Sequence, residues 1–145
     1  MKAAQAANIL TILAGADKPA LAVVDSFWQR GKPVRFQAKY TLHRDTISIT
    51  KPMLADFTND DELAFVLGHE LGHRALHRSW FRNAFHRQEV EREADAYAVK
   101  LMRGRGYDPT RVLWWFDRRV KANTGANRHK MSVRRNAAQA LIEGT

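Results

Sequence analysis

The sequence of 145 residues contains no cysteine and only four prolines. It also lacks any apolar run close to the ~20 residues that a membrane-spanning helix needs. Without cysteine the chain has neither a disulfide framework nor a thiolate metal site, so a transition metal would have to bind histidine and carboxylate side chains. The missing apolar run predicts a soluble chain, and the length suits one domain over residues 1–145.

Acidic residues are too few to balance the basic ones in the second half of the chain. Residues 1–73 carry eight Lys/Arg and eight Asp/Glu, whereas residues 74–135 carry sixteen Lys/Arg against six Asp/Glu. A basic half of this kind can attract nucleic acid, anionic lipid or acidic polypeptide. Most of these charges are scattered singly among apolar residues, which favours solvated helix faces. Apart from this charge nothing supports a nucleic-acid partner, and the sequence makes no prediction of the oligomeric state.

The N-terminal region predicts two helices within residues 1–31. Residues 3–14 are rich in alanine, and Gly15 ends this first helix. A charged residue followed by apolar ones faintly resembles a cleavable signal, but the polar residues Gln5 and Asn8 interrupt the apolar stretch. We therefore favour a cytoplasmic over a periplasmic location. A second helix is predicted over residues 19–29.

The remaining pattern predicts an α+β protein that is mostly helical. Apolar and polar residues alternate over residues 34–50, as in a β-hairpin beside the helix described next. Beyond Pro52 the periodicity is that of helices, which we expect at 59–77, 85–103, 108–121 and 132–143. The 108–121 helix contains adjacent aromatic residues, Trp114 to Phe116, that point in different directions on a helix, so at least part of this cluster belongs to the core.

The helix predicted at 59–77 contains the pattern HExxH, formed by His69, Glu70 and His73. Residues four apart lie on one face of a helix, so the two imidazoles can point at a single metal ion. Glu70 is turned about 100° away and can act as a general base. This is the zinc-peptidase signature, in which the two histidines bind zinc and the glutamate takes a proton from water.

Two glycines argue against the alternative that these histidines are ordinary core or surface residues. Gly68 and Gly72 lie within the same predicted helix, where each glycine costs roughly 0.5–1 kcal/mol relative to alanine. This cost is easier to understand if another group must approach the helix backbone closely. The pattern also lies in a strongly apolar segment, as expected of a buried site.

The third zinc ligand must come from another part of the chain. A metzincin would have a histidine where this sequence has Ser79, and His77 is a full turn beyond His73, so it is expected to flank the site. The helix at 85–103 offers two candidates, Glu91 and Glu93. Spacing alone leaves this choice open.

The sequence resembles the HtpX and CAAX-prenyl-protease type of zinc metallopeptidase, which also includes Oma-type and β-barrel-assembly-enhancing proteases. Three segments carry the resemblance, in the family's order: NDDELAFVLGHELGH, EREADAYAVKLMRGRGYDP and RHKMSVRR. Together they cover roughly residues 34–140. The resemblance implies a zincin-like fold of the gluzincin type and a zinc metalloendopeptidase with one Zn²⁺ per chain.

The resemblance also implies roles for single residues. It favours Glu91 as the third ligand beside the two histidines, Glu70 as the general base, and Asp95 as support for the ligands. His129 and Arg135 match a third family signature, although a lysine replaces its proline. Our hypothesis is that one of these two residues helps to stabilise the oxyanion of the tetrahedral intermediate.

The resemblance further implies that an extended substrate pairs with a strand beside the cleft, near residues 37–38. The family's asparagine is absent there, which leaves subsite preference open. The implied partner is a polypeptide, with unfolded or acidic chains as candidates.

Two alternatives to this function remain. One is a regulatory or DNA-associated metallopeptidase of the IrrE or SprT type, which also uses HExxH and would suit the basic half of the chain. The other is a zinc-stabilised binding module without turnover, which the intact Glu70 argues against.

Overall fold

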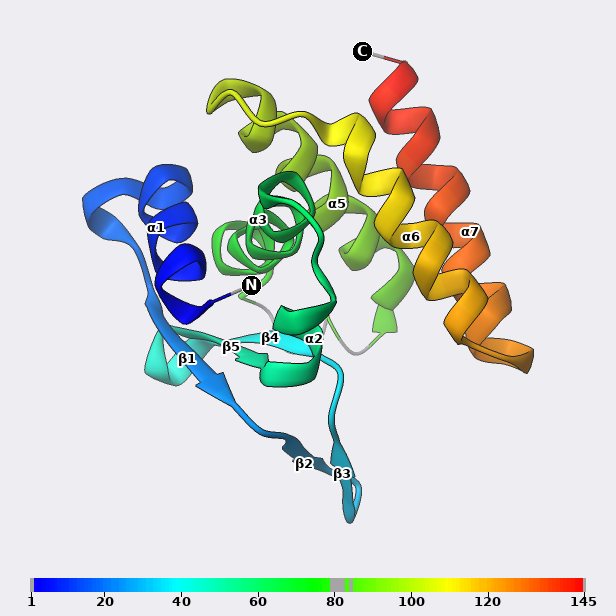
Figure 1. The fold of residues 1–145 in the computed structure, drawn as a ribbon, viewed down its shortest axis with the longest axis horizontal. Helices are drawn as coiled ribbons and strands as arrows, with labels where there is room; N and C mark the ends of the chain where they lie inside the picture. Colours follow the sequence, from blue (N-terminus) through cyan, green and yellow to red (C-terminus); the bar gives the residue numbers. More distant parts are fainter. Residues whose placement is uncertain (1, 79–82, 84, 145) are drawn as a thin grey trace.

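The computed structural model describes residues 2–78, 83 and 85–144 (Figure 1). The helices are α1 (Ala3–Ala14), α2 (Lys51–Asp56), α3 (Asp60–Leu76), α5 (Arg87–Gly104), α6 (Val112–Ala122) and α7 (Gly125–Glu143). Short 3₁₀ turns occur at η1 (Gly15–Asp17), η2 (Leu42–Arg44) and η3 (Pro109–Arg111). The strands are β1 (Ala20–Val24), β2 (Phe27–Gln29), β3 (Lys32–Val34), β4 (Ala38–Thr41) and β5 (Thr46–Thr50).

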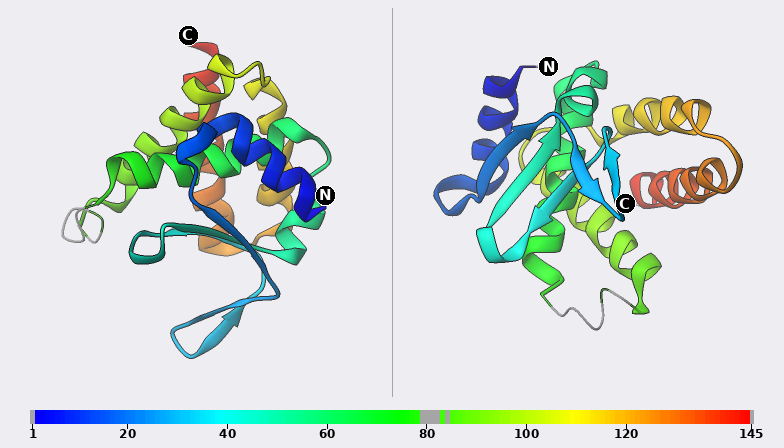
Figure 2. Two further views of the ribbon diagram at one scale, coloured as in Figure 1. Left: turned by 90° about the vertical axis from the view of Figure 1, so that its left-hand side faces the viewer. Right: turned by 90° about the horizontal axis from the view of Figure 1, so that it is seen from below.

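A small mixed sheet lies against one side of the helices, which confirms the prediction of a mostly helical α+β protein (Figures 1 and 2). Its strand order is β1-β5-β4, with β1 parallel and β4 antiparallel to β5. Ile47 and Ile49 of β5 are fully buried. Their alternation with polar residues is the period of two that predicted this strand.

The helix predicted at 19–29 is wrong, because the structure forms β1 and β2 there. In β1, Leu21 and Val23 lie opposite Ile47 and Ile49 of the parallel partner β5. A short apolar run does not by itself distinguish a buried strand from a helix, and this one becomes a strand because a distant strand pairs with it.

The predicted hairpin at 34–50 is partly different in the structure. Strands β4 and β5 form its two arms, with Tyr40 opposite Ile47. Val34, however, pairs with Phe27 in a separate hairpin of β2 and β3. That hairpin turns at Arg30 and Gly31, both of which have positive φ, and it projects away from the helices (Figure 1).

The C-terminal helices also differ from the prediction. The helix expected at 132–143 begins seven residues earlier, at Gly125, and the segment expected at 108–121 starts as a 3₁₀ turn before α6. α6 and α7 lie side by side and flank α3 and α5 (Figures 1 and 2). Trp115 and Phe116 are buried in the core, while Trp114 is 57% exposed.

The central helix is α3, which carries HExxH through the core. Asn59 caps its N-terminus, because its side-chain oxygen accepts a hydrogen bond from the Glu62 backbone N–H at 3.0 Å. Acidic residues follow in the first turn, where the helix dipole favours them. Every residue from Glu62 to Gly72 is buried. Such a helix can present histidines to a cavity only where a neighbouring element leaves space.

Helix α3 packs most extensively against α5, and the contact is formed at Gly68, directly before HExxH, and Gly72, within it. A Cβ added at Gly68 would lie 3.2 Å from the Cα and the Cβ of Ala98. A Cβ added at Gly72 would lie 3.0 Å from the Cα of Ala94. The close approach expected from these glycines is therefore the approach of α5, the helix that carries the acidic candidates for the third ligand.

Among the described residues, no helix is both long and apolar enough to cross a membrane.

Candidate metal centre

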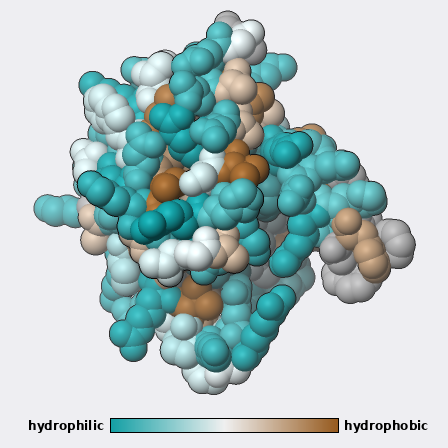
Figure 3. Space-filling view, turned by 90° about the vertical axis from the view of Figure 1, so that its right-hand side faces the viewer, coloured by the Kyte–Doolittle hydropathy of each residue, from teal (hydrophilic) through white to brown (hydrophobic). Residues whose placement is uncertain are grey.

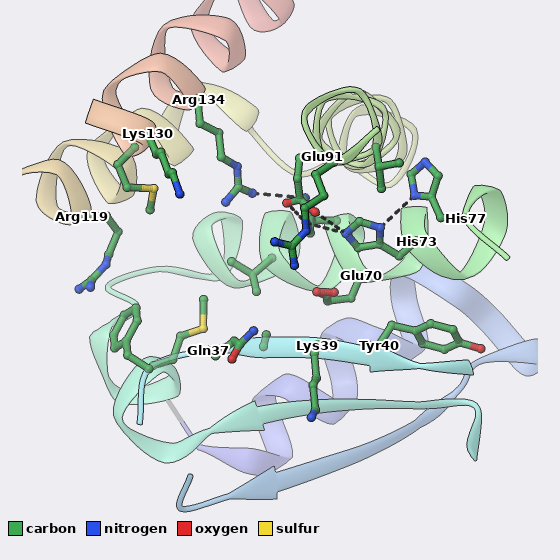
Figure 4. Close-up of a pocket in the computed structure, with 18 of the residues that line it drawn as sticks. Gln37, Lys39, Tyr40, Glu70, His73, His77, Glu91, Arg119, Lys130 and Arg134 are labelled. Carbon is green, nitrogen blue, oxygen red and sulfur yellow. Dashed lines mark hydrogen bonds and ion pairs between the residues drawn. The ribbon is translucent and has the colours of Figure 1, made fainter. Parts of the chain in front are cut away.

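Helices α3 and α5 bring three possible metal ligands together. The Nε2 atoms of His69 and His73 lie 3.0 Å apart. The carboxylate of Glu91 reaches both, with Oε2 at 3.2 Å from Nε2 of His69 and Oε1 at 3.1 Å from Nε2 of His73 (Figure 4). The three side chains form one compact cluster of two nitrogens and a carboxylate.

The geometry of this cluster fits a zinc ion. Bonds of 2.0–2.1 Å in a tetrahedral site put neighbouring ligand atoms about 3.3 Å apart, and the distances between these side chains are 3.0 to 3.2 Å. Two imidazoles and one carboxylate are also a ligand set of known catalytic zinc sites, which leave a fourth position for water or substrate. His69, His73 and Glu91 are therefore suited to hold Zn²⁺.

Asp95 and Arg134 fix the orientation of His69. Nδ1 of His69 lies 2.7 Å from Oδ1 of Asp95, so a proton on Nδ1 leaves the lone pair of Nε2 facing the cluster. Arg134 donates to both Asp95 oxygens, from Nε at 3.0 Å and from Nη2 at 2.8 Å. Asp95 is 3% exposed, and this buried carboxylate is thus paired with His69 on one side and with Arg134 on the other.

These contacts shift the pKa values of the groups involved. Burial raises the pKa of Asp95, but the charges of Arg134 and His69 outweigh it and lower the value to about 2. Burial and Arg134 lower the pKa of His69, but Asp95 and Glu91 outweigh them and raise it to about 9. Burial raises the pKa of Glu91, yet hydrogen bonds with both imidazoles lower it well below its ordinary value.

His73 is supported by a different set of side chains. Its Nδ1 lies 2.9 Å from Nδ1 of the buried His77, and Nε2 of His77 lies 3.7 Å from Oε2 of Glu93. Glu93 thus lies behind His77, while Glu91 lies at the imidazoles. His77 flanks the cluster, as expected from its position one turn beyond His73.

Glu70 lies beside the cluster and is buried, with one carboxylate oxygen, Oε2, unpartnered among the described residues. Burial raises the pKa of Glu70, although the charges of His69 and His73 oppose this effect. An unpartnered buried carboxylate oxygen facing a cavity is available to a water molecule or a substrate.

The cluster opens into a cavity of about 900 Å³. Strand β4 lines one side, and residues of α3, α5, α6 and α7 line most of the rest (Figure 4). β4 pairs with β5 along one edge, and no strand of the described chain pairs with its other edge. The cavity therefore places an available strand edge beside Glu70.

The structure places His129 and Arg135 outside this cavity. His129 is exposed, and Arg135 donates to Oδ1 of Asp117 at 3.0 Å; neither lines the cavity wall. Arg134, which sequence reasoning missed, lines it instead. Helical spacing could have identified Arg134, since it lies three residues after Met131 and four before the buried Ala138 and so shares a helix face with them.

Comparison with known proteins identifies one part of the chain. Residues 36–85 match the model of peptidase family M48, which confirms the resemblance found in the sequence. The matched part contains β4 and α3 with HExxH, but not Glu91 or Asp95. It supports a peptidase and does not favour the DNA-associated alternative. No curated protein and no solved structure matches the chain.

Proposed function

We propose that this chain, with residues 36–85 that match peptidase family M48, is a zinc-dependent metalloendopeptidase. The observation that carries the proposal is the cluster of His69, His73 and Glu91, whose ligand atoms lie 3.0–3.2 Å apart. Beside it, Glu70 presents an unpartnered carboxylate oxygen. Ligands, a base and an open cavity are the components that hydrolysis of a peptide bond requires.

His69, His73 and Glu91 would hold one Zn²⁺ in this function. The ion supplies Lewis acidity, which lowers the pKa of water and polarises a carbonyl. Asp95 and Arg134 keep the His69 ring in the orientation in which Nε2 faces the cluster. His77 does the same for His73 through the contact between their Nδ1 atoms.

Glu70 is the proposed general base and acid. Its carboxylate would accept a proton from the attacking water and then donate this proton to the amine of the departing peptide. A raised pKa suits both steps, since it brings the proton affinity of the carboxylate closer to that of the attacking water and of the departing amine.

Strand β4 supports an extended polypeptide as the substrate. Its free edge can pair with the substrate backbone, which positions a peptide by main-chain hydrogen bonds independently of its sequence. The cavity of about 900 Å³ has room for several residues of an extended peptide beside this edge. An endopeptidase acting on unfolded segments fits these features best.

The test is Glu70→Gln, which keeps the size of the side chain but removes the base. We expect the turnover of unfolded casein to fall by at least about 10²-fold, while metal analysis still finds one zinc per chain. Glu89→Gln is the matched control, because Glu89 is an exposed carboxylate on α5 that does not line the cavity. Full activity of Glu70→Gln would rule out the assigned role, and zinc binding by a wild-type protein without turnover would indicate a binding module.

A further inference from the structure

The cavity has a basic wall that the proposed chemistry does not use. Arg119 of α6 and Lys130 of α7 line it, together with Asn123 and Asn127 from the region where these helices join. Figure 4 shows Arg119 and Lys130 on the same side of the cavity as Arg134, away from His77. Arg134 is already paired with Asp95, so Arg119 and Lys130 are the cations of this wall that remain available to bind a substrate.

Neither cation forms an ion pair with a carboxylate in the part of the chain that the structure describes, although the charge of Asp56 acts on Arg119 from a longer distance. The guanidinium of Arg119 lies over the ring of Phe36, 3.7 Å from its centroid, which holds the charge in place without neutralising it. The next residue, Arg118, is by contrast paired with Glu62 at 2.7 Å. Lys130 is exposed, and no ion pair joins it to a described acid.

The acids of the cavity are gathered elsewhere. The only described carboxylates that line it are Glu70 and Glu91, and both belong to the proposed metal centre. The polar groups that α6 and α7 present to the cavity are therefore cations and amides without a carboxylate, beside the apolar side chains of Trp115 and Met131. In a concave site this arrangement attracts anions and repels cations.

The outer surface on this side has few apolar side chains that could bind a polypeptide. Figure 3 views the molecule from the side of α6 and α7 and shows a mainly hydrophilic surface, with apolar residues in small separate patches. Charge is thus the main chemistry that the outer surface on this side offers for distinguishing one polypeptide from another.

We propose that Arg119 and Lys130 form a carboxylate-binding subsite, so that the enzyme prefers polypeptides with a carboxylate close to the cleaved bond. This inference rests on the proposed peptidase function and adds a substrate class to it. Two sources supply the same chemistry: an Asp or Glu side chain, and the free C-terminus of a peptide. Asn123 and Asn127 can add neutral hydrogen-bond donors to either carboxylate.

Binding tests the subsite separately from turnover. Zinc-loaded Glu70→Gln protein is titrated into fluorescent peptides that differ only by Glu or Gln at one position, each with a free or an amidated C-terminus. We expect one carboxylate to strengthen binding about fivefold, the effect of about 1 kcal/mol, and added salt to weaken this preference. The pair of peptides that shows the preference identifies the source of the carboxylate.

Variants assign the preference to the two residues. Arg119→Gln with Lys130→Gln should bind the acidic and neutral peptides equally, and the exposed Lys130→Gln alone should lose part of the preference without affecting the fold. Lys121→Gln is the matched control, since it removes the same charge from α6 at an exposed position outside the cavity. It should keep the wild-type preference.

The outcomes separate the subsite from the peptidase proposal. Equal binding of acidic and neutral peptides by the parent protein, or a preference that survives in the double variant, overturns the subsite whether or not the wild type cleaves casein. Displacement of the peptides by an oligonucleotide, without discrimination between Glu and Gln, also overturns it. A preference that the double variant loses supports the subsite, and the casein assay then decides the proposed function by itself.

Discussion

Arg134 and Arg135 are neighbours in the chain with very different surroundings. Arg134 makes two hydrogen bonds to Asp95, a carboxylate that is 3% exposed. Arg135 pairs with Asp117, whose side chain is 58% exposed. A charge left alone in a buried site costs far more than one left at the surface, so equal substitutions at these two positions should have unequal effects.

We predict that Arg134→Ala destabilises the protein by about 3 kcal/mol, because Asp95 loses its main counter-charge. Zinc affinity should fall as well, since His69 loses a fixed orientation. Urea unfolding and competition with a chromophoric chelator measure the two effects. Arg135→Ala is the control, with an expected change below about 1 kcal/mol; an equal loss in both variants would contradict the assignment of Arg134 as the positioning residue.

At the scale of elements, the contact between α3 and α5 decides where the metal ligands lie. Gly72 has the backbone of Ala94 against it, where an added Cβ would meet the Cα at 3.0 Å. We predict that Gly72→Ala destabilises the fold by about 1–3 kcal/mol, because backbone atoms cannot yield as a side chain can. It should also weaken zinc binding by pushing α5 outward.

Gly104→Ala is the matched control for Gly72→Ala. Gly104 ends α5 with nothing within 4 Å of the position of its Cβ, so alanine there should be neutral or slightly stabilising. Thermal unfolding and zinc titration of both variants provide the comparison. If the two glycines respond alike, helix propensity and not the close contact explains the effect.

A second link between elements joins the start of α3 to α6. Glu62 is fully buried, and both of its oxygens accept hydrogen bonds from Arg118 at 2.7 and 3.0 Å. Burial raises the pKa of Glu62, but Arg118 and the backbone of Thr58 outweigh it and lower the value below its ordinary 4.5. A lowered pKa in the folded state means stability that is present above about pH 4.5 and lost as the pH falls.

We therefore predict that Glu62→Gln costs about 3 kcal/mol of unfolding free energy at pH 7, and that this difference from wild type shrinks below about pH 4.5. Urea unfolding from pH 7 to pH 3, with a chelator present in both samples, measures it without a contribution from zinc. A difference that stays constant over this range would show that Glu62 is not the group being titrated.

The elements also show what sequence can predict and where it fails. Helical spacing was enough to place His69 and His73 together, because both lie on α3 and need no information about distant residues. The strand β1 could not be found in this way, since its pairing with β5 involves residues more than twenty positions away. Local pattern therefore predicts sites within one helix better than it predicts pairing.

The same limit explains why sequence could not identify the candidate site residues on α5 and α7. Spacing could not decide between Glu91 and Glu93, and only the resemblance to a family favoured Glu91. Arg134 was missed because α7 was expected to begin at Ser132 and because the face that a helix turns to its neighbours depends on packing. The positions of both Glu91 and Arg134 depend on how two helices pack together, which the local sequence does not specify.

At the scale of the whole molecule, zinc should stabilise the fold as a ligand of the native state. Its proposed ligands come from two helices, so binding links α3 to α5. At free zinc of about 100 times Kd we expect about 2.7 kcal/mol of added stability, or a rise in Tm of about 8 °C. Scanning calorimetry with zinc and with a chelator measures this shift.

Glu91→Ala should remove most of the zinc-dependent rise in Tm, since only two ligands would remain. Magnesium should give no rise in the wild type, because it prefers oxygen ligands and this cluster offers two nitrogens. A shift that persists in Glu91→Ala would place the third ligand elsewhere in the chain.

The glycine contact between α3 and α5 also bears on how this protein can diverge. The spacing of the proposed ligands is dictated by two main chains in contact, so it does not depend on the shape of any large side chain. Aliphatic residues around the site can be exchanged over many generations while the distance between the helices stays the same. The substitutions that such a lineage should tolerate least are the smallest ones, a single methyl group at either glycine.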